Sequence, residues 1–413
     1  MIKNGERYGR ALVIGGGIAG PVVAMALQRV GIDSIIFEAS PVPSDGVGAF
    51  LTLASNGLDA LQAIDAHRPV VAAGVRTERM VLSSATGKFL GVVEAGIPLT
   101  DGTTTTTIER AQLYRVLHDQ VLPRGIPIVH GKRLIDLEQS PDGVLARFAD
   151  GTEERGGFLV GADGIWSSTR QLLDPEAPRP EYTGLLGVGG VARGVDLETH
   201  PFSFEMMFGT RAFFGFLGAG DGRALWFANL PSRPEPDRAA LEAVSPGAWR
   251  DRLLEAFAGD AVPVRDLIDA TDQNALRAAP MHTLEPPRSW HRGRAVLVGD
   301  AAHATSPSSG QGASLAAEDA VELARCLRDV PDLGAAFHAY QRLRERRVRR
   351  VLRAARRVNS DKAAGPVARR IRDAVMPLML RTMATPERQL WLLGHHIDFT
   401  GAVGGPRTLL AAA

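Results

Sequence analysis

The feature that most constrains the fold of this chain is a glycine-rich turn close to its N-terminus. Residues 10–28 contain a short β-type run, then Gly15, Gly17 and Gly20 in the spacing Gly-x-Gly-x-x-Gly, then a helical pattern. Gly15 permits a tight turn, Gly17 lets a pyrophosphate approach the backbone, and Gly20 lets the helix pack closely against the strand. Because the helix N-terminus then points at phosphate, this stretch predicts a Rossmann-like dinucleotide-binding fold.

A second β-type run, residues 33–37, leads directly into Glu38. A carboxylate at this place, about 20 residues after the glycines, accepts hydrogen bonds from the ribose hydroxyls of an adenine dinucleotide. Residues 187–192 (GVGGVA) also fit a relaxed glycine pattern, but the residues after them, up to Pro201, do not continue as a helix. We interpret them as a twisted strand. One dinucleotide fold is therefore visible, and NAD, NADP and FAD all use such a fold.

Length and composition limit the class of protein. A chain of 413 residues is too long for one ordinary core, which predicts two domains or one domain with a large insertion. The formal net charge of +1 gives no overall attraction to nucleic acid or to an anionic membrane. No apolar run reaches the roughly 20 residues of a spanning helix, so a cytoplasmic location is expected. The single cysteine, Cys326, excludes cysteine-based metal sites and is expected to be a buried hydrophobe.

Two further turns follow β-type runs, and each carries a carboxylate. Residues 158–164 (FLVGADG) end at the turn with Asp163, and residues 295–312 (AVLVGDAAHATSPSSGQG) contain the turn with Asp300. The second of these crosses a Pro/Ser/Gly-rich stretch and then enters a helical pattern. Residues 107–113, between the N-terminal glycine-rich element and the turn with Asp163, open another helix.

Taken together, the three turns resemble those of the class A FAD-dependent flavoprotein monooxygenases, single-component aromatic hydroxylases with a fold like that of para-hydroxybenzoate hydroxylase. That family carries the same three signatures in the same order, and the resemblance covers roughly residues 10–360. It implies an α/β fold, with a Rossmann-like FAD-binding domain, an inserted β-rich substrate domain and a helical C-terminal segment. The expected boundaries are 1–75, 102–182 and 276–330 for the discontinuous FAD-binding domain, 76–101 and 183–275 for the substrate-binding β-sheet domain, and 331–413 for the C-terminal helical segment.

The resemblance also implies roles for residues at the three turns. Asp300 would accept a hydrogen bond from a ribityl hydroxyl of FAD, Arg110 would contact the pyrophosphate or the ribityl region, and Asp163 would lie near the pyrophosphate. The helix after Asp300 would direct its N-terminal dipole at the flavin. No catalytic side chain and no metal site are expected, because the flavin carries the chemistry. The expected FAD-binding residues are Gly15, Gly17, Ile18, Ala19, Gly20, Glu38, Arg110, Asp163, Gly299, Asp300, Pro307, Gly310, Gln311, Gly312 and Ala313, of which Pro307, Gly310 and Gly312 would lie near the isoalloxazine.

One stretch departs from the family pattern. After the acidic residue of the second strand the family usually carries an arginine, where this chain has residues 44–50 (SDGVGAF). The glycines Gly46 and Gly48 are kept, but the missing arginine leaves the docking of NADH or NADPH open. We expect Asn56 to cap the helix that follows. We also expect His303 to pack the third turn.

The substrate candidates come from the β-type and aromatic region between about residues 183 and 275. Alternate residues of antiparallel strands face the same side, and one such face would line a cavity over the flavin. A set of aromatic side chains there favours a flat, apolar substrate. The candidate substrate contacts are Phe204, Met206, Phe214, Phe216 and Phe227.

Two charged features lie in the C-terminal third. Residues 342–357 carry nine arginines beside Glu345, and the apolar residues among them indicate a helix with one packed side and one solvated basic face. Asp319 follows Asp300 in the next helix. Because Asp319 lies beyond the strand end, we expect its removal to affect FAD binding far less than removal of Asp300.

The function implied by the resemblance is monooxygenation. Hydride would pass from NADPH or NADH to non-covalent FAD, O2 would add to form a flavin C4a-hydroperoxide, and an aromatic or polyketide-like small molecule would be hydroxylated or epoxidised. The partners would be that substrate, NAD(P)H and O2, without nucleic acid or integral membrane, in a monomer or homodimer. Three alternatives stay open: another flavin enzyme on the same fold (halogenase, reductase or oxidase), an NAD-dependent dehydrogenase, and a non-enzymatic flavin- or ligand-binding protein.

Overall fold

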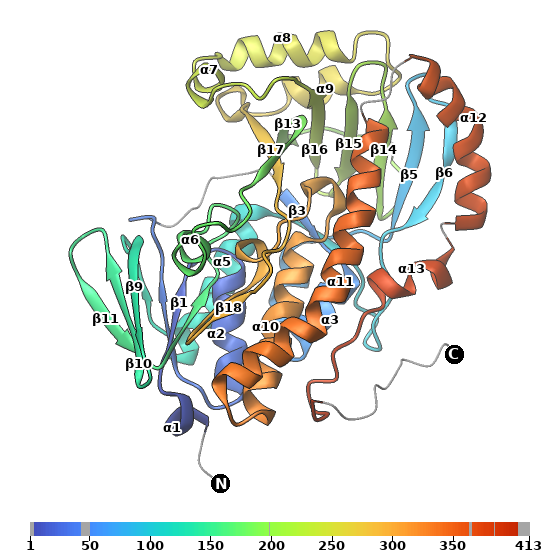
Figure 1. The fold of residues 1–413 in the computed structure, drawn as a ribbon. Coiled ribbons are helices and arrows are strands. Elements are labelled where there is room, and N and C mark those ends of the chain that lie inside the picture. The colour runs from blue at the N-terminus through green and yellow to red at the C-terminus, as the bar shows by residue number, and fades with distance from the viewer. Residues whose placement is uncertain (1–3, 43–49, 198, 363–365, 384, 404–413) are drawn as a thin grey trace.

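The first layer of the protein is a six-stranded sheet, in the lower half of Figure 1. The computed structural model describes residues 4–42, 50–197, 199–362, 366–383 and 385–403. Four of the five strand pairs are parallel, and β18 pairs antiparallel with β19 at one edge. The central strands are buried on both faces, as the apolar runs in the sequence predict. In order across the sheet the strands are β18 (His291–Arg292), β19 (Ala295–Leu297), β12 (Phe158–Gly161), β1 (Ala11–Ile14), β2 (Ser34–Phe37) and β8 (Ile128–Val129).

Helices pack around this sheet and complete the main core. The helix α2 follows β1 and contacts both α5 and α10, while α3 also contacts α10. A Cβ at Gly20 would lie 1.9 Å from the carbonyl oxygen of Gly15, so the close approach of helix and strand requires glycine there. The predicted strand, turn and helix are therefore confirmed. The helices are α1 (Asn4–Tyr8), α2 (Ala19–Arg29), α3 (Ser55–Gln62), α4 (His67–Ala73), α5 (Arg110–Val121), α6 (Ser168–Leu173) and α10 (Gly312–Asp329).

Two small sheets lie beside the first. In one of them β7 pairs with β3 and β4, so residues 106–109 are extended and the helix predicted from residue 107 begins at Arg110. The other is an antiparallel sheet at the left of Figure 1. The strands are β3 (Phe50–Leu53), β7 (Thr106–Glu109) and β4 (Val75–Arg76) in the first, and β11 (Glu153–Gly156), β10 (Gly143–Phe148) and β9 (Leu134–Ser140) in the second.

A seven-stranded, mostly antiparallel sheet forms the upper half of Figure 1. Only its β14–β5 pair is parallel. Residues 187–192 lie inside β13, so their interpretation as a strand rather than a second dinucleotide turn is confirmed. Across the sheet the strands are β17 (Ala278–Thr283), β13 (Glu181–Arg193), β16 (Arg223–Pro231), β15 (Phe213–Gly218), β14 (Ser203–Phe208), β5 (Arg79–Ser84) and β6 (Phe89–Glu94).

The two faces of this sheet have different neighbours. One face packs under α7 (Arg238–Glu242), α8 (Pro246–Ala256) and α9 (Val264–Asp269), where Trp226 meets Trp249 in a separate apolar core. The other face packs against Phe50 of β3, which belongs to the small sheet beside the six-stranded layer. The seven-stranded sheet therefore has one structural face and one face turned toward the dinucleotide fold. The predicted domain boundaries themselves stay a prediction.

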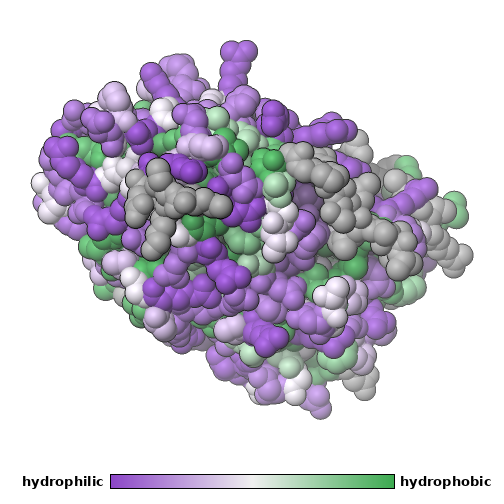
Figure 2. All heavy atoms as spheres, turned by 90° about the horizontal axis from the view of Figure 1, so that it is seen from below, coloured by the Kyte–Doolittle hydropathy of each residue, from purple (hydrophilic) through white to green (hydrophobic). Residues whose placement is uncertain are grey.

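The C-terminal segment is helical, as predicted, and its described residues form three helices. The long helix α11 (Leu333–Lys362) runs along α10, α12 (Pro366–Met383) packs on β6, and α13 (Pro386–Leu393) lies near α3. Figure 1 shows α11 crossing from the lower layer to the upper one. Figure 2 shows that the face seen from below is mostly hydrophilic. No helix among the described residues is long and apolar enough to cross a membrane.

A close contact between α3 and α10 gives the first testable prediction. A Cβ at Gly57 would lie 2.6 Å from the Cα and Oγ atoms of Ser314, whereas a Cβ at Gly247 in α8 would meet nothing within 4 Å. We expect Gly57→Ala to lower the free energy of unfolding by about 1–3 kcal/mol, because the backbone of α10 must move away. Gly247→Ala should leave stability unchanged or raise it by up to about 1 kcal/mol. Urea unfolding followed by circular dichroism measures both, and equal effects would contradict this packing.

Candidate functional site

The three predicted turns converge in space. A Cβ at Gly15, whose φ is +105°, would lie 2.4 Å from the carbonyl oxygen of Ala162, so the first turn touches the second. A Cβ at Gly299 would lie 3.0 Å from the Cβ of Ala316 and 3.5 Å from the Cβ of Ala19, so the third turn touches the start of α2 and the first turns of α10. Gly15 requires glycine because the backbone of Ala162 approaches so closely, and Gly299 favours glycine because its φ is +56°.

The first turn is held open for a ligand. A Cβ at Gly17 would meet nothing within 4 Å, and α2 begins after Ile18 without a side-chain cap. The carboxylate of Glu38 accepts a hydrogen bond from the Gly16 amide at 2.7 Å and another from the Ser40 amide at 2.7 Å. Each carboxylate oxygen has a second lone pair available for a ribose hydroxyl. The free amides of the first turn of α2 point at the same space.

Asp163 in the second turn has a different role from Asp300. One of its oxygens accepts from the Ser167 hydroxyl at 2.6 Å, and the other accepts from the amide and hydroxyl of Thr169 at 2.9 and 3.0 Å. These bonds, with the Ser167 cap, close the N-terminus of α6. The buried Arg170 then donates to the carbonyl oxygens of Ala301 at 2.9 Å and Ile165 at 2.8 Å, which ties the second turn to the third.

Asp300 lies in the third turn, η3 (Gly299–Ala301), with its carboxylate exposed and with no hydrogen bond to the described residues. Desolvation of the carboxyl group by the surrounding protein raises the pKa of Asp300, while His303 and Arg110 oppose that shift electrostatically. Arg110, the first residue of α5, is also exposed. The structure thus brings Arg110 to the same side as Asp300, with both side chains available to a ligand.

The loop after Asp300 leads into α10 with little side-chain cover. Pro307 opens η4 (Pro307–Ser309) and is exposed, Gly310 has a φ of +61°, and the Gln311 amide donates to the Ser309 hydroxyl at 3.2 Å. The helix α10 begins at Gly312 without a side-chain cap. Its N-terminal amides therefore face Asp300, whose Oδ1 would lie 3.7 Å from a Cβ at Gly312. Ala313, in the same first turn, is half-buried.

Asp319 supports the third turn from beneath. It is fully buried, and its Oδ2 atom accepts from the Gly299 amide at 2.9 Å and from the His303 Nε2 at 2.7 Å. Its Oδ1 atom accepts from Arg344 at 2.7 Å. Burial alone would raise the pKa of Asp319, but the charges of His303 and Arg344 lower this pKa below its usual value. His303 therefore packs the turn as expected, but Asp319 is a central support and not a minor residue of the next helix.

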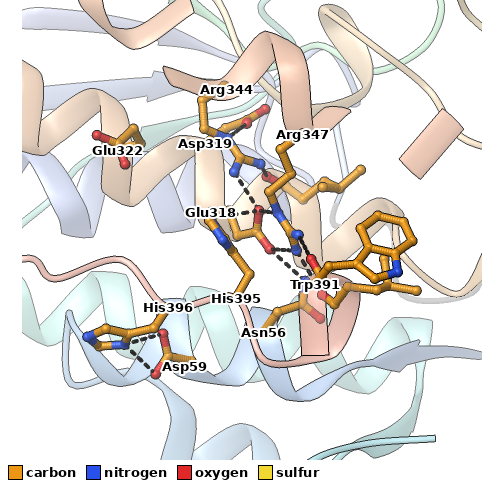
Figure 3. A network of polar contacts seen from close by, with 12 residues as sticks. Asn56, Asp59, Glu318, Asp319, Glu322, Arg344, Arg347, Trp391, His395 and His396 are labelled. Atoms are coloured by element: carbon orange, nitrogen blue, oxygen red, sulfur yellow. Dashed lines mark hydrogen bonds and ion pairs between the residues drawn. The ribbon is translucent and has the colours of Figure 1, made fainter. Parts of the chain in front are cut away.

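Glu318, next to Asp319, holds a second set of contacts that Figure 3 shows. Its carboxylate accepts from Arg344 at 2.5 Å, from two nitrogens of Arg347 at 2.6 and 2.7 Å, and from the Asn56 amide at 2.6 Å. Asn56 also donates to the Gln311 side chain at 3.1 Å. Desolvation opposes ionisation, but the two arginines hold the pKa of Glu318 well below its usual range. The residues beside the predicted isoalloxazine site are thus fixed through α3, α10 and α11.

Two sequence interpretations are corrected by this network. Asn56 does not cap α3, because Ala54 precedes the helix and the Asn56 side chain points at α10 instead. The arginine-rich part of α11 is not simply a solvated face, because the Arg344 side chain is 1% exposed and the Arg347 side chain is 9% exposed in ion pairs. An arginine of an amphipathic helix can face the core when a buried carboxylate pairs with it.

The five substrate candidates divide between the two faces of the seven-stranded sheet. Phe204, Met206 and Phe227 lie on the face that packs against Phe50, with ring centroids 5.8 Å apart for the pair of Phe204 and Phe227. Phe214 and Phe216 lie on the opposite face, in the core under α8 and α9. The strand alternation makes a common cavity for all five impossible, so Phe214 and Phe216 are corrected to core residues.

Sequence reasoning missed several residues that shape the site. Phe50 joins the inner aromatic face, and the His118 Nε2 atom donates to the Gly16 carbonyl oxygen at 2.7 Å, while burial lowers the pKa of His118. A signal existed for the acidic pair Glu318 and Asp319, since charged residues interrupt an apolar helical pattern there. The departure at residues 44–49, including Gly46 and Gly48, lies outside the described residues.

The arrangement fits the flavin dinucleotide expected from the sequence. Two helices, α2 and α10, start without side-chain caps and face a common space, and between them lie an open glycine, Gly17, and the exposed carboxylate of Asp300. Uncapped helix N-termini bind anionic groups such as a pyrophosphate and stabilise charge on a reduced flavin. Glu38, Asp300 and Arg110 would supply contacts to the ribose, the ribityl chain and the phosphates.

Comparison with known proteins gives an independent result. The FAD binding domain family matches residues 9–355. The aurachin C monooxygenase/isomerase of Stigmatella aurantiaca is 36% identical over 345 residues, covering 81% of this chain and 85% of that protein. The chloroplastic zeaxanthin epoxidase of Oryza sativa subsp. japonica is 31% identical over 364 residues, 84% of this chain and 53% of that protein, so this chain spans about half of the epoxidase.

A solved structure is similar over nearly its whole length. The crystal structure of Klebsiella pneumoniae HpxO complexed with FAD and uric acid matches 94% of this chain and 98% of that chain, with a TM-score of 0.82 and 26% sequence identity. The layers described above, including the seven-stranded sheet and the long α11, are therefore part of a shared architecture.

Asp300 gives the second testable prediction. We expect Asp300→Ala to raise the dissociation constant of FAD at least about tenfold, because a charge-assisted hydrogen bond contributes about 1.5–3 kcal/mol. Asp142→Ala is the matched control, since Asp142 is an exposed carboxylate in the turn between β9 and β10. Titration of the apoprotein with FAD, followed by flavin fluorescence, measures both constants. Equal FAD affinities of the two variants would show that Asp300 does not bind FAD.

Asp319 gives a third prediction, which concerns stability and not FAD affinity. We expect Asp319→Ala to lower the free energy of unfolding by about 3–5 kcal/mol, because it leaves the buried Gly299 amide without its acceptor and removes one of the two carboxylates that pair with the buried Arg344. Glu345→Ala removes an exposed ion pair with Arg349 on the same surface of α11 and should cost at most about 1 kcal/mol. Urea unfolding of the FAD-free proteins separates the two, and a small loss for Asp319→Ala would contradict the support role.

Proposed function

Since this chain belongs to the FAD-dependent monooxygenase family defined by the FAD binding domain, we propose that it oxygenates a planar aromatic or polyketide-like small molecule, with NADPH or NADH as the electron donor. The family assignment, the α/β fold and FAD as the cofactor agree with the sequence-based predictions. The alternative of an NAD-dependent dehydrogenase is wrong. The choice between hydroxylation and epoxidation belongs to the proposal.

The observation that carries the substrate class is the aromatic inner face of the seven-stranded sheet. Phe50, Phe204 and Phe227 lie within about 6 Å of one another by ring centroids, at 5.8 Å for Phe50–Phe204 and 6.1 Å for Phe50–Phe227. Met206 and Phe227 are only partly buried, so apolar surface is accessible there. Aromatic side chains prefer flat, apolar partners. A relative bound to uric acid, itself a planar ring system, is consistent with this preference.

In this proposal the chain positions the reactants and supplies little acid or base chemistry. Bound non-covalently, FAD would supply the redox chemistry, accepting hydride from the nicotinamide and activating O2. Gly17 and Glu38 would bind the pyrophosphate and ribose, and Asp300 and Arg110 would hold the ribityl region. The N-terminus of α10 would stabilise negative charge on the ring edge, since its amides are uncapped and fixed in place.

The residues that the structure describes form one dinucleotide-binding fold, and no second one among them could hold the electron donor. The one other glycine-rich match, residues 187–192, is strand β13, so the reduced nicotinamide would approach FAD without a dedicated Rossmann domain. The proposed substrate should then accelerate FAD reduction, because a ternary arrangement limits wasteful release of peroxide. Monomer or homodimer, and a cytoplasmic location, remain part of the proposal.

Anaerobic stopped-flow reduction of the FAD-loaded protein tests this function. The rate with NADPH and with NADH is measured alone and with a panel of phenols, quinolones, indoles and polyketide aromatics. At least one compound should raise the rate and yield an oxygenated product in air. If none changes the rate and turnover yields only peroxide, an oxidase or a flavin-binding protein is the better account.

The fourth prediction concerns the two faces of the sheet. We expect Phe227→Ala to raise the KM for the substrate found in that panel about tenfold, because it removes apolar surface from the inner face. Phe214→Leu should leave KM unchanged while lowering the free energy of unfolding by about 1–2 kcal/mol, because Phe214 is fully buried in the opposite core. Steady-state kinetics and urea unfolding measure the pair. A larger KM change for Phe214→Leu would contradict the proposed face.

A further inference from the structure

A groove outside the cofactor site lies between α11 and α13. It is open to solvent and has a volume of about 920 Å³, and it is lined by Arg346, Arg350, Arg353, Ala354, Glu387, Arg388 and Trp391. The three arginines of α11 follow the spacing i, i+4, i+7, which places them on one face of the helix. Pockets of this size accommodate small organic ligands.

The groove is strongly positive although the whole chain carries a net charge of only +1. Four guanidinium groups line it against one carboxylate, that of Glu387. Hydrogen bonds from its own backbone amide and from Thr385 lower the pKa of Glu387, so this carboxylate is engaged at the start of α13. One ionised carboxylate offsets only one of the four guanidinium charges, so the groove keeps a net positive charge.

The unpaired state of these arginines distinguishes them from their neighbours on α11. Arg344 and Arg347 bind Glu318, and Arg349 binds Glu345 at 2.8 Å. By contrast, no ion pair with a carboxylate is found for the four groove arginines within the described residues, and all four are exposed. Four like charges held around one groove repel each other, and an anionic ligand would remove that repulsion.

Contacts from α11 hold the α13 wall of the groove in place. The Arg350 guanidinium lies 3.9 Å from the centroid of the Trp391 ring. The Trp391 carbonyl oxygen accepts from Arg347 at 2.6 Å, and the Leu392 carbonyl oxygen accepts from the same side chain at 2.9 Å. Figure 3 shows Arg347 between Trp391 and the buried Glu318. A preformed wall lowers the ordering cost of binding.

We propose that this groove is a binding site for a ligand with two or more phosphate groups, of the size of a nucleoside diphosphate. Arginine forks match phosphate oxygens bidentately, and several of them select a multiply charged phosphate over a single carboxylate. The half-exposed indole of Trp391 adds an apolar surface for the organic part of such a ligand. The phosphates can belong to a free nucleotide or to lipid headgroups, which present the same chemistry.

Calorimetric titration of the FAD-loaded protein with inorganic pyrophosphate and with NADP+ tests the site. Saturation with FAD keeps both probes out of the flavin site, and an oxidised nicotinamide cannot start turnover. Co-sedimentation with phosphatidylglycerol vesicles, compared with phosphatidylcholine vesicles, tests the lipid source. The double variant Arg350→Ala/Arg388→Ala removes one arginine from each wall, and Arg265→Ala, an exposed arginine of α9, is the matched control.

Saturable binding that the double variant weakens at least about tenfold, and that Arg265→Ala leaves unchanged, is the expected result. Binding of pyrophosphate or NADP+ identifies a free phosphate ligand, and binding of anionic vesicles alone identifies lipid headgroups. The proposal is overturned if no probe binds saturably, or if the double variant binds as tightly as the unmodified protein. Retained FAD content and circular dichroism show that the double variant is folded, so a loss of binding reports on the groove.

Discussion

Two adjacent buried carboxylates, Glu318 and Asp319, hold the cofactor side of this protein together. Neighbouring residues on a helix point about 100° apart, so the two side chains reach different elements. Asp319 reaches back to the Gly299 turn and to His303, while Glu318 reaches forward to Asn56 of α3 and Arg347 of α11. Arg344 bonds to both carboxylates, and each of these three side chains is at most 1% exposed. Removing ions from water is costly, so this geometry is stable only with all partners in place.

This support from beneath explains why the ligand side of the turns is open. The N-terminus of α6 is capped by the Ser167 and Asp163 side chains, which accept from the Arg170 and Thr169 amides. The N-termini of α2 and α10 have no side-chain cap, yet their turns are held by Glu38 and by Asp319 through the Gly16 and Gly299 amides. Of three similar strand-turn-helix elements, two are therefore prepared for an anionic group and one is structural.

The sequence was sufficient for the features that depend on local chain geometry. Gly15, Gly20 and Gly299 could be predicted because a positive φ or a close backbone approach excludes other residues. The buried network could not be predicted in this way, because Asn56 and Glu318 are 262 positions apart and their pairing depends on how α3 docks on α10. For the same reason the arginines of α11 were interpreted as one solvated face, although Arg344 is buried, Arg347 is mostly buried and others line a groove. Helix periodicity shows which residues share a face of the helix, but it does not show which element packs against that face.

The seven-stranded sheet shows the same limit for strands. Alternation correctly groups Phe204 with Met206 and Phe214 with Phe216, but it does not say which group faces the cofactor domain. The contacts of Phe50 show which group it is, because Phe50 belongs to β3 of the small sheet beside the dinucleotide fold and packs against Phe204 and Phe227. Gly215 makes that packing possible, since a Cβ there would lie 2.6 Å from the Phe227 ring, 3.0 Å from the Met206 sulfur and 3.0 Å from the Phe204 ring. The aromatic face therefore depends on one residue without a side chain, and any side chain at position 215 would occupy the space in which these three residues meet.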